Sequence, residues 1–438
     1  HLYLKNTSNS NSNINSNSNN DKTKGENYLV KDNIDKYRDY VNNIIENYYY
    51  NNLLDKNIIK TIQQKYQVKP KNSIIIYLLK EQYSKYNIDI KTYNYLLNFF
   101  QAKSCRSNSG ILQVSIMTSP DSFSCSENCY FCPDQKGMPR SYIKEEPAVR
   151  RAAQEGFDTV KQIHNRLTSY SINGHDIDKL EIIVLGGTWS NYPIDYQIQF
   201  MTDVYYGVNT FFEKRNVNTK YSLQKEKEIN ETTFCKIIGL TIETRPDYIN
   251  EPEINRFINY GVTRVQLGIQ TTNDYVLKKI NRGCTTNDAI KAFKMLKDSG
   301  FKILIHLMQN LPYSSPEIDM TTFDDVIYKQ ELQADEFKIY PTSVTQTSDK
   351  DNTEVYTVIE KWFNSGKYTP YDNEEVMDVI IYGKMIIPKY IRISRIFRDI
   401  PKGNIVAGAD IPHMREVVQK KMKTKYNSEC KCIKCREI

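Results

Sequence analysis

The chain has 438 residues, of which 59 are Lys or Arg, 52 are Asp or Glu and nine are Cys. This length allows two or three domains with a sizeable core, and no apolar run is long enough for a transmembrane helix. The first twenty residues lack the pattern of a secretory signal, so the cysteines indicate metal or redox chemistry rather than a disulfide framework.

Positive charge is concentrated in one segment of the chain. Between Lys56 and Arg106 there are ten Lys or Arg residues and two acidic ones, a net charge of +8 that exceeds the +7 of the whole chain. We therefore expect any polyanionic partner to contact this segment.

The amino-terminal part of the chain changes character near residue 28. Residues 6–20 are Asn or Ser at 13 of 15 positions, a composition that cannot bury enough apolar surface to fold. We expect residues 1–27 to be disordered, with a regulatory insertion as the alternative. Residues 28–104 then show helical spacing, for example at Tyr40, Ile44 and Tyr48, and Ser73 is the expected N-cap of a helix over residues 74–86.

Tyrosines are interleaved with lysines in this helical segment. Lysines attract phosphates and aromatic faces stack on bases, so the segment is a candidate nucleic-acid surface. The alternative is that the tyrosines form the core of a small helical domain. They are Tyr66, Tyr77, Tyr83, Tyr86, Tyr93 and Tyr95.

From Gly110 onward, short β-rich runs alternate with helix-length segments. Such alternation, repeated about six times, predicts a parallel α/β sheet or barrel within residues 105–401. The expected strands cover Ile111–Met117, Leu180–Leu185, Cys235–Thr241, Val262–Gly268, Phe301–Leu307 and Glu336–Ile339. The expected helices cover Ala148–Arg166, Pro252–Tyr260, Asn287–Ser299 and Met320–Glu331. A short Cys-rich tail, residues 402–438, follows.

The strongest chemical motif is a three-cysteine loop directly after the first expected strand, with Cys125, Cys129 and Cys132 in CxxxCxxC spacing. A zinc site normally takes four protein ligands, and no fourth Cys or His lies nearby. Three thiolates suit a [4Fe-4S] cluster with one iron left open. Together with Phe131, the spacing resembles the signature of radical S-adenosylmethionine (SAM) enzymes, which implies that SAM binds the open iron.

The ends of the next strands carry further candidate residues. Gly186, Gly187 and Thr188 follow the second strand, where glycines allow close approach of a ligand, and radical SAM enzymes usually have a similar SAM-binding element there. Candidate inward-facing polar side chains follow on the later strands; for Glu243 and Arg245 the alternative is a buried ion pair, and for His306 a satisfied core histidine. These side chains belong to Glu243, Arg245, Gln266, Gln270 and His306.

A set of motifs then makes the resemblance specific. In this order and over residues 28–438, they resemble the catalytic subunit of the Elongator complex, a radical SAM family that carboxymethylates the wobble uridine of tRNA. The motifs are Ser141-Tyr142, Glu146-Pro147, Gly174-His175, Asp178-Lys179, Val184–Thr188, Tyr192-Pro193, Gly239–Asp247, Asn281-Arg282-Gly283, Lys338–Pro341, Arg398–Pro401 and Cys430–Glu437.

The resemblance implies a reaction, its cofactors and its site. SAM cleavage at the cluster would yield a radical that takes hydrogen from the methyl of acetyl-CoA, and the carbon radical would add to C5 of the uridine. It implies an acetyl-CoA contact at Lys179 and tRNA contacts on the basic helical segment, where we select Lys60, Lys65, Lys69 and Lys71. The alternatives are a tRNA-binding scaffold with an incomplete catalytic site and, less favoured, a protein acetyltransferase.

The terminal cysteines Cys430, Cys432 and Cys435 match a zinc-binding linker of the family. A structural zinc site needs a fourth ligand, for which His413 is a candidate, and three reduced thiols are the alternative. The three remaining cysteines match no ligand pattern, and we expect them to be buried or half-buried. They are Cys105, Cys235 and Cys284.

The chain departs from the family in two places. The family continues into an acetyltransferase domain, which we expect to be absent here because the chain stops at Ile438. Gln309 and Asn310 replace a frequent Pro-Asp pair on the fifth strand. The resemblance also implies a cytoplasmic protein, with a nuclear pool as the alternative, that acts with Elongator-like subunits or as a homodimer.

Overall fold

The computed structural model describes residues 34–86, 88–103, 106–121, 125–213, 215, 219–346, 355–411 and 413–437. The Asn/Ser-rich segment and Cys105 lie outside the described residues. The chain forms two compact units. The first contains the residues up to Leu112 together with residues 164–180, and the second contains residues 113–163 and 181–438, so the Cys-rich tail joins the second unit.

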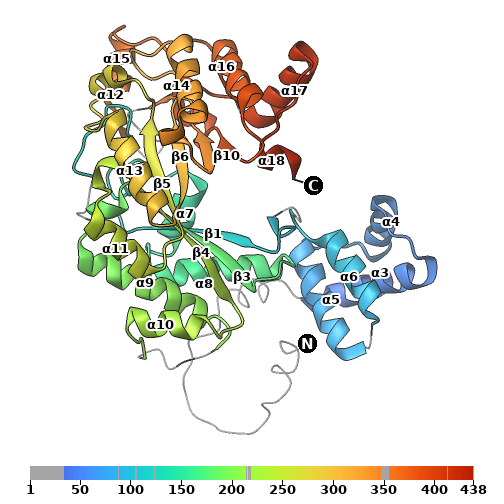
Figure 1. Cartoon of the computed structure of the whole chain (residues 1–438). Coiled ribbons are helices and arrows are strands. Elements are labelled where there is room, and N and C mark those ends of the chain that lie inside the picture. Colours follow the sequence, from blue (N-terminus) through green and yellow to red (C-terminus); the bar gives the residue numbers. More distant parts are fainter. Residues whose placement is uncertain are drawn as a thin grey trace. The chain divides into compact units, whose positions relative to one another are not determined.

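Among the described residues of the first unit, four α-helices precede β1, the blue part of Figure 1, and most of α8 (Thr159–Ile172) also belongs to this unit. The four helices are α3 (Arg38–Asn51), α4 (Lys56–Tyr66), α5 (Asn72–Tyr86) and α6 (Ile90–Phe100), preceded by the 3-10 turn η1 (Ile34–Tyr37). Asp55 and Asp89 cap α4 and α6 by accepting backbone N–H groups. Tyr40, Ile44 and Tyr48 are buried, as the helical spacing predicts.

The predicted N-cap at Ser73 is wrong, because α5 begins one residue earlier, at Asn72. The Lys71 carbonyl accepts the N–H groups of Ile74 and Ile75, which closes the first turn. Ser73 therefore lies inside that turn.

The second unit contains a seven-stranded sheet in the order β1-β3-β4-β5-β6-β7-β10. The pairs from β4 to β10 are parallel, which confirms the predicted α/β half-barrel. The strands are β1 (Leu112–Met117), β3 (Lys179–Leu185), β4 (Lys236–Thr244), β5 (Arg264–Gln270), β6 (Lys302–Leu307), β7 (Glu336–Ile339) and β10 (Arg392–Ile396). Two small antiparallel pairs join β2 (Asp134–Gln135) to β9 (Val355–Tyr356) and β8 (Ser343–Thr345) to β11 (Ile405–Gly408).

The seventh strand, β10, corrects the expectation of six. Its sequence, Arg-Ile-Ser-Arg-Ile, buries only Ile393 and Ile396, so it lacks the continuous apolar run by which the other strands are found. The predicted helix over residues 148–166 is also wrong, because Gly156 and Phe157 both adopt positive φ and separate two helices.

Helices follow most strands and pack on the sheet. For example, α9 contacts β4, α13 contacts both β5 and β6, and α17 contacts β10. No helix among the described residues is long and apolar enough to cross a membrane. The helices are α7 (Pro147–Gln154), α8 (Thr159–Ile172), α9 (Ile194–Asn209), α10 (Leu223–Asn230), α11 (Glu251–Tyr260), α12 (Asp274–Lys279), α13 (Thr286–Asp298), α14 (Pro316–Tyr328), α15 (Val358–Asn364), α16 (Asn373–Ile386), α17 (Met414–Tyr426) and α18 (Ile433–Arg436).

The two ends of the sheet are linked by a buried ion pair. Arg398 follows β10 at one edge, and Glu146 lies in the segment after β1 at the other. Arg398 Nε and Nη2 donate to the two carboxylate oxygens of Glu146 at 3.1 and 2.7 Å, and Nη2 also donates to the Ser141 carbonyl. This contact joins the segments that follow the two edge strands of the sheet.

Candidate functional site

The three-cysteine loop follows β1 at the carboxyl end of the sheet. Cys129 is buried, whereas Cys125 and Cys132 are half-buried. The loop turns tightly, with Cys132 N–H donating to the Cys129 carbonyl at 3.0 Å, and Tyr130 N–H anchors it to the Ile280 carbonyl at 3.0 Å. Among the described residues, these thiols are not part of a group whose ligand atoms all lie within 4.8 Å of one another.

Hydrogen-bond donors surround the first two sulfur atoms. Thr188 Oγ1 donates to Cys125 Sγ at 3.3 Å. Arg282 Nη1 and Arg245 Nη1 approach Cys129 Sγ at 3.6 and 4.0 Å. Positive charge and donors beside sulfur stabilise thiolates, which are the form that binds metal.

The third sulfur lies beside Arg140. Burial raises the pKa of the Cys132 thiol, while the Arg140 guanidinium opposes this shift. Arg140 also donates to Asp134 and Asn128, at 2.9 and 2.5 Å, so it is fixed against the loop. The sequence analysis did not predict that Arg140 and Arg282 belong to the site. Arg282 could have been found from its place in the Asn281-Arg282-Gly283 motif, which was used only as evidence for the family resemblance.

Gly186 and Gly187 form a close turn at the end of β3. Their φ angles are +150° and +92°, values that other residues rarely adopt. A Cβ on Gly186 would lie 1.7 Å from Thr118 Oγ1, and one on Gly187 would lie 3.0 Å from the Arg140 carbonyl. Glycine is therefore required for the turn to pack this closely on Thr118 and Arg140, and Thr188 connects the turn to the cysteine loop.

A polar network fills the inner side of the sheet. His306 Nε2 lies 3.0 Å from Gln266 Oε1 and its Nδ1 lies 3.5 Å from Glu243 Oε1. Lys338 Nζ donates to Gln266 Oε1 at 2.6 Å, and Tyr142 OH donates to Glu243 at 2.9 Å. The structure therefore brings together the predicted residues Glu243, Gln266 and His306, and it adds two residues that the sequence analysis did not single out.

The electrostatics of this network follow from burial. Burial raises the pKa of Glu243, although Lys338 and Tyr142 favour its charged form. Burial, followed by the nearby Lys338 and Arg398 charges, lowers the pKa of His306 well below its usual value. The lowered pKa favours the neutral form of the His306 ring.

The buried ion pair considered for Glu243 and Arg245 does not form. Arg245 instead makes a bidentate contact with Asp247, at 2.9 Å for both bonds, and turns its remaining nitrogen toward Cys129. Glu243 faces the inner network and Arg245 faces the cysteine loop, so the two residues serve different parts of the site.

Several buried polar atoms near the loop and the inner network have no hydrogen-bond partner within the described structure. Such atoms are costly unless a ligand or water satisfies them. Together with three thiols surrounded by donors and the glycine turn, they fit a [4Fe-4S] cluster and SAM. The atoms are Arg140 Nε, Gln266 Nε2, Gln270 Oε1 and Arg282 Nε.

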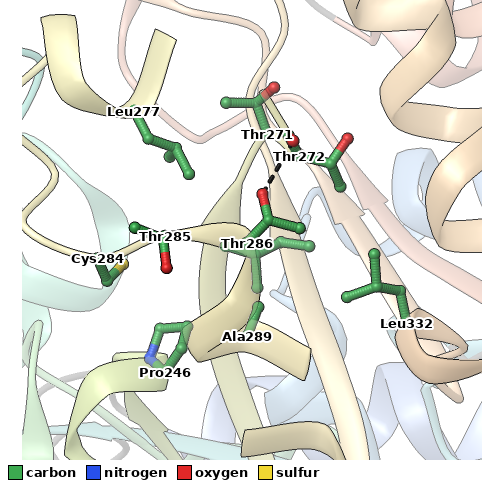
Figure 2. Close-up of a pocket in the computed structure, with 10 residues that line it drawn as sticks. Pro246, Thr271, Thr272, Leu277, Cys284, Thr285, Thr286, Ala289 and Leu332 are labelled. Atoms are coloured by element: carbon green, nitrogen blue, oxygen red, sulfur yellow. Dashed lines mark hydrogen bonds between the residues drawn. The ribbon is translucent and has the colours of Figure 1, made fainter. Parts of the chain in front are cut away.

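The cleft drawn in Figure 2 does not extend this site. It lies between the end of β5 and α13, and it is too narrow to admit a water molecule. Its lining includes Cys284, which is buried as expected, and Thr271, Thr272 and Thr286, of which Thr286 Oγ1 donates to the Thr272 carbonyl at 2.9 Å. Cys235, also expected to be buried, lies at the start of β4 and is 1% exposed.

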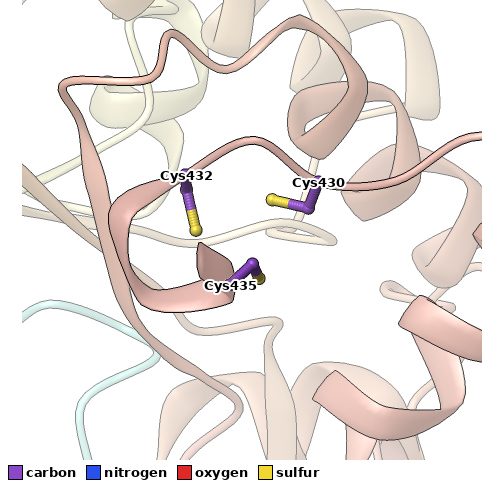
Figure 3. Close-up of side chains that lie close together, drawn as sticks. All are labelled: Cys430, Cys432 and Cys435. Carbon is purple, nitrogen blue, oxygen red and sulfur yellow. The ribbon is translucent and has the colours of Figure 1, made fainter. Parts of the chain in front are cut away.

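The terminal cysteines form a compact group of metal-ligand atoms. The sulfur atoms of Cys430, Cys432 and Cys435 all lie within 4.8 Å of one another; Cys430 and Cys432 precede α18, and Cys435 lies on it (Figure 3). His413 is not a member of this group and is exposed. Hydrogen bonds from Cys430 and Cys432 lower the pKa of Cys435, so one thiolate is available in the group before metal binds.

Three donors from two helices converge on Cys435. Lys384 Nζ on α16 lies 3.5 Å from its sulfur, and Arg415 Nη1 and Gln419 Nε2 on α17 lie at 3.6 and 3.1 Å. Lys384 is completely buried. Three thiolates around a divalent ion leave a net negative charge, which these cations balance.

The remaining predicted residues lie elsewhere. Lys179 is the first residue of β3, at the opposite end of that strand from Gly186, and pairs with Asp178 at 2.9 Å. The four lysines selected as tRNA contacts, Lys60, Lys65, Lys69 and Lys71, are exposed on α4 and the turn after it. The tyrosines are divided between the two interpretations: Tyr66 packs on the helical core, whereas Tyr77 and Tyr95 are 43% and 38% exposed.

Comparisons with known proteins place the chain among known families. A family model described as the radical SAM superfamily matches residues 120–320, and one described as the radical SAM C-terminal domain matches residues 334–424. The chain therefore carries both radical SAM domains, a match that supports a [4Fe-4S] cluster and SAM as cofactors.

Relatives narrow the family. The chain is 38% identical to a tRNA uridine(34) acetyltransferase of Methanocaldococcus jannaschii over 84% of its own length and 64% of the relative's. It is 36% identical to the protein of that name from Methanocaldococcus infernus, covering 91% and 72%. A solved structure of archaeal Elp3 from M. infernus with an N-terminal deletion matches with a TM-score of 0.62 and 35% identity, covering 75% and 66%.

These matches assign the chain to the family of tRNA uridine(34) acetyltransferases, which includes proteins named Elongator complex protein 3. The chain spans about two thirds of the length of these relatives.

Proposed function

We propose that this protein modifies the wobble uridine of tRNA as a radical SAM enzyme. The observation that carries the proposal is the cysteine loop at the carboxyl end of a parallel half-barrel, in a chain whose relatives are named for action on uridine 34 of tRNA. The relatives' name describes acetyl transfer; the finer proposal is carboxymethylation at C5 of the uridine with acetyl-CoA as co-substrate.

The described residues have distinct proposed roles. Cys125, Cys129 and Cys132 hold the cluster, and the turn at Gly186 and Gly187 receives SAM. When bound, the cluster and SAM supply the radical that takes hydrogen from acetyl-CoA. The inner network positions the reacting groups and keeps water from them.

Other ligands take surfaces outside the sheet interior. Lys179 is the proposed acetyl-CoA contact, and the exposed lysines of the first unit bind tRNA phosphates. The three terminal thiolates bind Zn²⁺ with a fourth ligand from water or another group. Action in the cytoplasm, with Elongator-like subunits or a second copy of the chain as partners, completes the proposal.

The proposed reaction is tested with the full chain after anaerobic reconstitution with iron and sulfide. We expect 5′-deoxyadenosine from SAM and, with acetyl-CoA and tRNA, a modified uridine identified by mass spectrometry. Exchange of all three loop cysteines for Ala should abolish SAM cleavage, and a variant that still cleaves SAM would refute the cluster assignment.

The second candidate function is a tRNA-binding scaffold, which the exposed lysines of the first unit favour. Binding would then survive loss of the loop cysteines and weaken steeply with salt. Combined exchange of Lys60, Lys65, Lys69 and Lys71 for Ala should weaken tRNA binding in either case, and unchanged affinity would refute this placement of the RNA surface.

A further inference from the structure

Four aromatic side chains of the second unit form a continuous series of ring contacts, here called the aromatic row. Tyr275 on α12 meets Tyr313 edge to face at 6.2 Å between ring centroids. Tyr313 meets Trp362 on α15 at 6.0 Å, and Trp362 meets Tyr130 at 5.1 Å. The three contacts join segments far apart in sequence, so the fold itself assembles the row.

The outer end of the row is open to solvent. Tyr275 is 57% exposed and Tyr313 is 40% exposed. Lys279 Nζ lies 5.3 Å from the centroids of both rings, and Lys367 Nζ lies 4.2 Å from that of Trp362. Exposed aromatic faces stack on flat ligands, and lysines beside them attract anions, so this arrangement suits a flat, anionic ligand.

The charges around the row are not neutralised by ion pairs. None of the four exposed lysines nearby pairs with a carboxylate among the described residues; they are Lys278, Lys279, Lys361 and Lys367. The neighbouring carboxylate of Asp274 accepts the Thr286 N–H instead. By contrast, Lys421 on α17 contacts both Glu374 and Asp378. The row therefore combines rings with positive charge that is free to attract phosphates.

The inner end of the row lies in the cysteine loop. Tyr130 directly follows Cys129, its N–H donates to the Ile280 carbonyl, and its carbonyl accepts the Ile359 N–H at 3.1 Å. Trp362 and Tyr130 also share a hydrophobic cluster with Phe131. A ligand on Tyr275 and Tyr313 would thus lie at the cysteine loop, on the side where α12 and α15 are found (Figure 1).

We propose that the aromatic row binds unpaired bases of an RNA loop, with Tyr275 and Tyr313 as stacking surfaces and the four lysines as phosphate contacts. This inference rests on the proposed function and deepens it, because it assigns the recognition of the single-stranded part of the substrate to the radical SAM unit. Stacking explains the exposed rings, which an acidic protein partner would not require, and phosphates explain the unpaired lysines.

The test compares two RNA probes by fluorescence anisotropy with the full chain. One is an anticodon stem–loop, and the other is a fully paired duplex of the same length. The combined Tyr275→Ala and Tyr313→Ala variant should bind the stem–loop about ten-fold more weakly and the duplex unchanged, because base stacking is lost and the lysines remain. Exchange of both tyrosines for Phe should retain stem–loop affinity.

The control removes two exposed tyrosines outside the row, Tyr328 and Tyr390, which are 64% and 60% exposed. Both Ala variants should melt at the wild-type temperature. The inference is overturned if the row variant keeps its stem–loop affinity or if stem–loop and duplex weaken alike. If the wild-type chain binds neither RNA, the proposed function fails as well.

Discussion

Replacing the buried Lys384 by Met tests whether the terminal cysteines form a metal site. Its ammonium lies 3.5 Å from Cys435 Sγ and has no contact with solvent. At an effective dielectric constant of about 20, a unit charge at this distance contributes roughly 5 kcal/mol of direct attraction to a thiolate. Desolvation and the metal's own charge offset most of that attraction.

The net effect is therefore expected to match that of other groups that support metal ligands, about 10- to 100-fold in affinity. Zinc affinity is measured on reduced protein by competition with a chromophoric chelator. In the metal-free protein, Lys384→Met removes a buried cation, and Cys435 can take up a proton in its place, so the free energy of unfolding should fall by less than the free energy of zinc binding does. A loss of zinc affinity without a matching loss of stability separates a role at the metal from a general packing role.

The control is Lys420→Met, since Lys420 is an exposed lysine of α17. Its zinc affinity should equal that of the wild type. Equal affinities for wild type and Lys384→Met, or an equal loss in both variants, would refute the reasoning that Lys384 balances the thiolate charge.

Three further predictions concern the sheet and its edges. Burial raises the pKa of Asp319 to about 6 from 3.8, so its contribution to stability is full below pH 3.8 and is lost as pH rises through about 6. Urea unfolding should show up to about 3 kcal/mol of such loss between pH 4 and 7, and Asp319→Asn should lack it; identical pH profiles would contradict the assignment. Gly186→Ala should unfold at a much lower temperature and lose SAM binding because of its contact with Thr118, whereas Gly156→Ala, with open space around it, should cost only about 1–2 kcal/mol. Arg398→Lys keeps the charge but loses the bidentate contact with its carboxylate, so unfolding in urea should require about 3 kcal/mol less; a loss below 0.5 kcal/mol would show that the ion pair across the sheet edges is dispensable.

Local patterns predicted the parts of the fold whose signal lies in one short window. The strand Glu336–Ile339 has the predicted bounds, and the cysteine loop lies at the expected strand end. The strand at Arg392–Ile396 was missed because two of its inward positions carry the whole apolar signal.

The support of the site could not be predicted from the sequence because it depends on tertiary contacts. Arg282 and Cys129 are 153 residues apart, yet their side chains meet at 3.6 Å. Lys338 was visible only as part of a motif, and its contact with Gln266 required the register of β5, β6 and β7. The aromatic row likewise joins residues from two loops and two helices, so no periodicity marks it.

The ion pair between Glu146 and Arg398 has a consequence for the order in which the protein assembles. The two residues are 252 positions apart, and β2 pairs with β9 across a similar separation. During synthesis the cysteine loop leaves the ribosome long before the residues that hold it, and contacts of such long range form slowly. We therefore expect the thiols to stay accessible in the nascent chain until β10 is complete, so insertion of the iron–sulfur cluster would follow closure of the half-barrel.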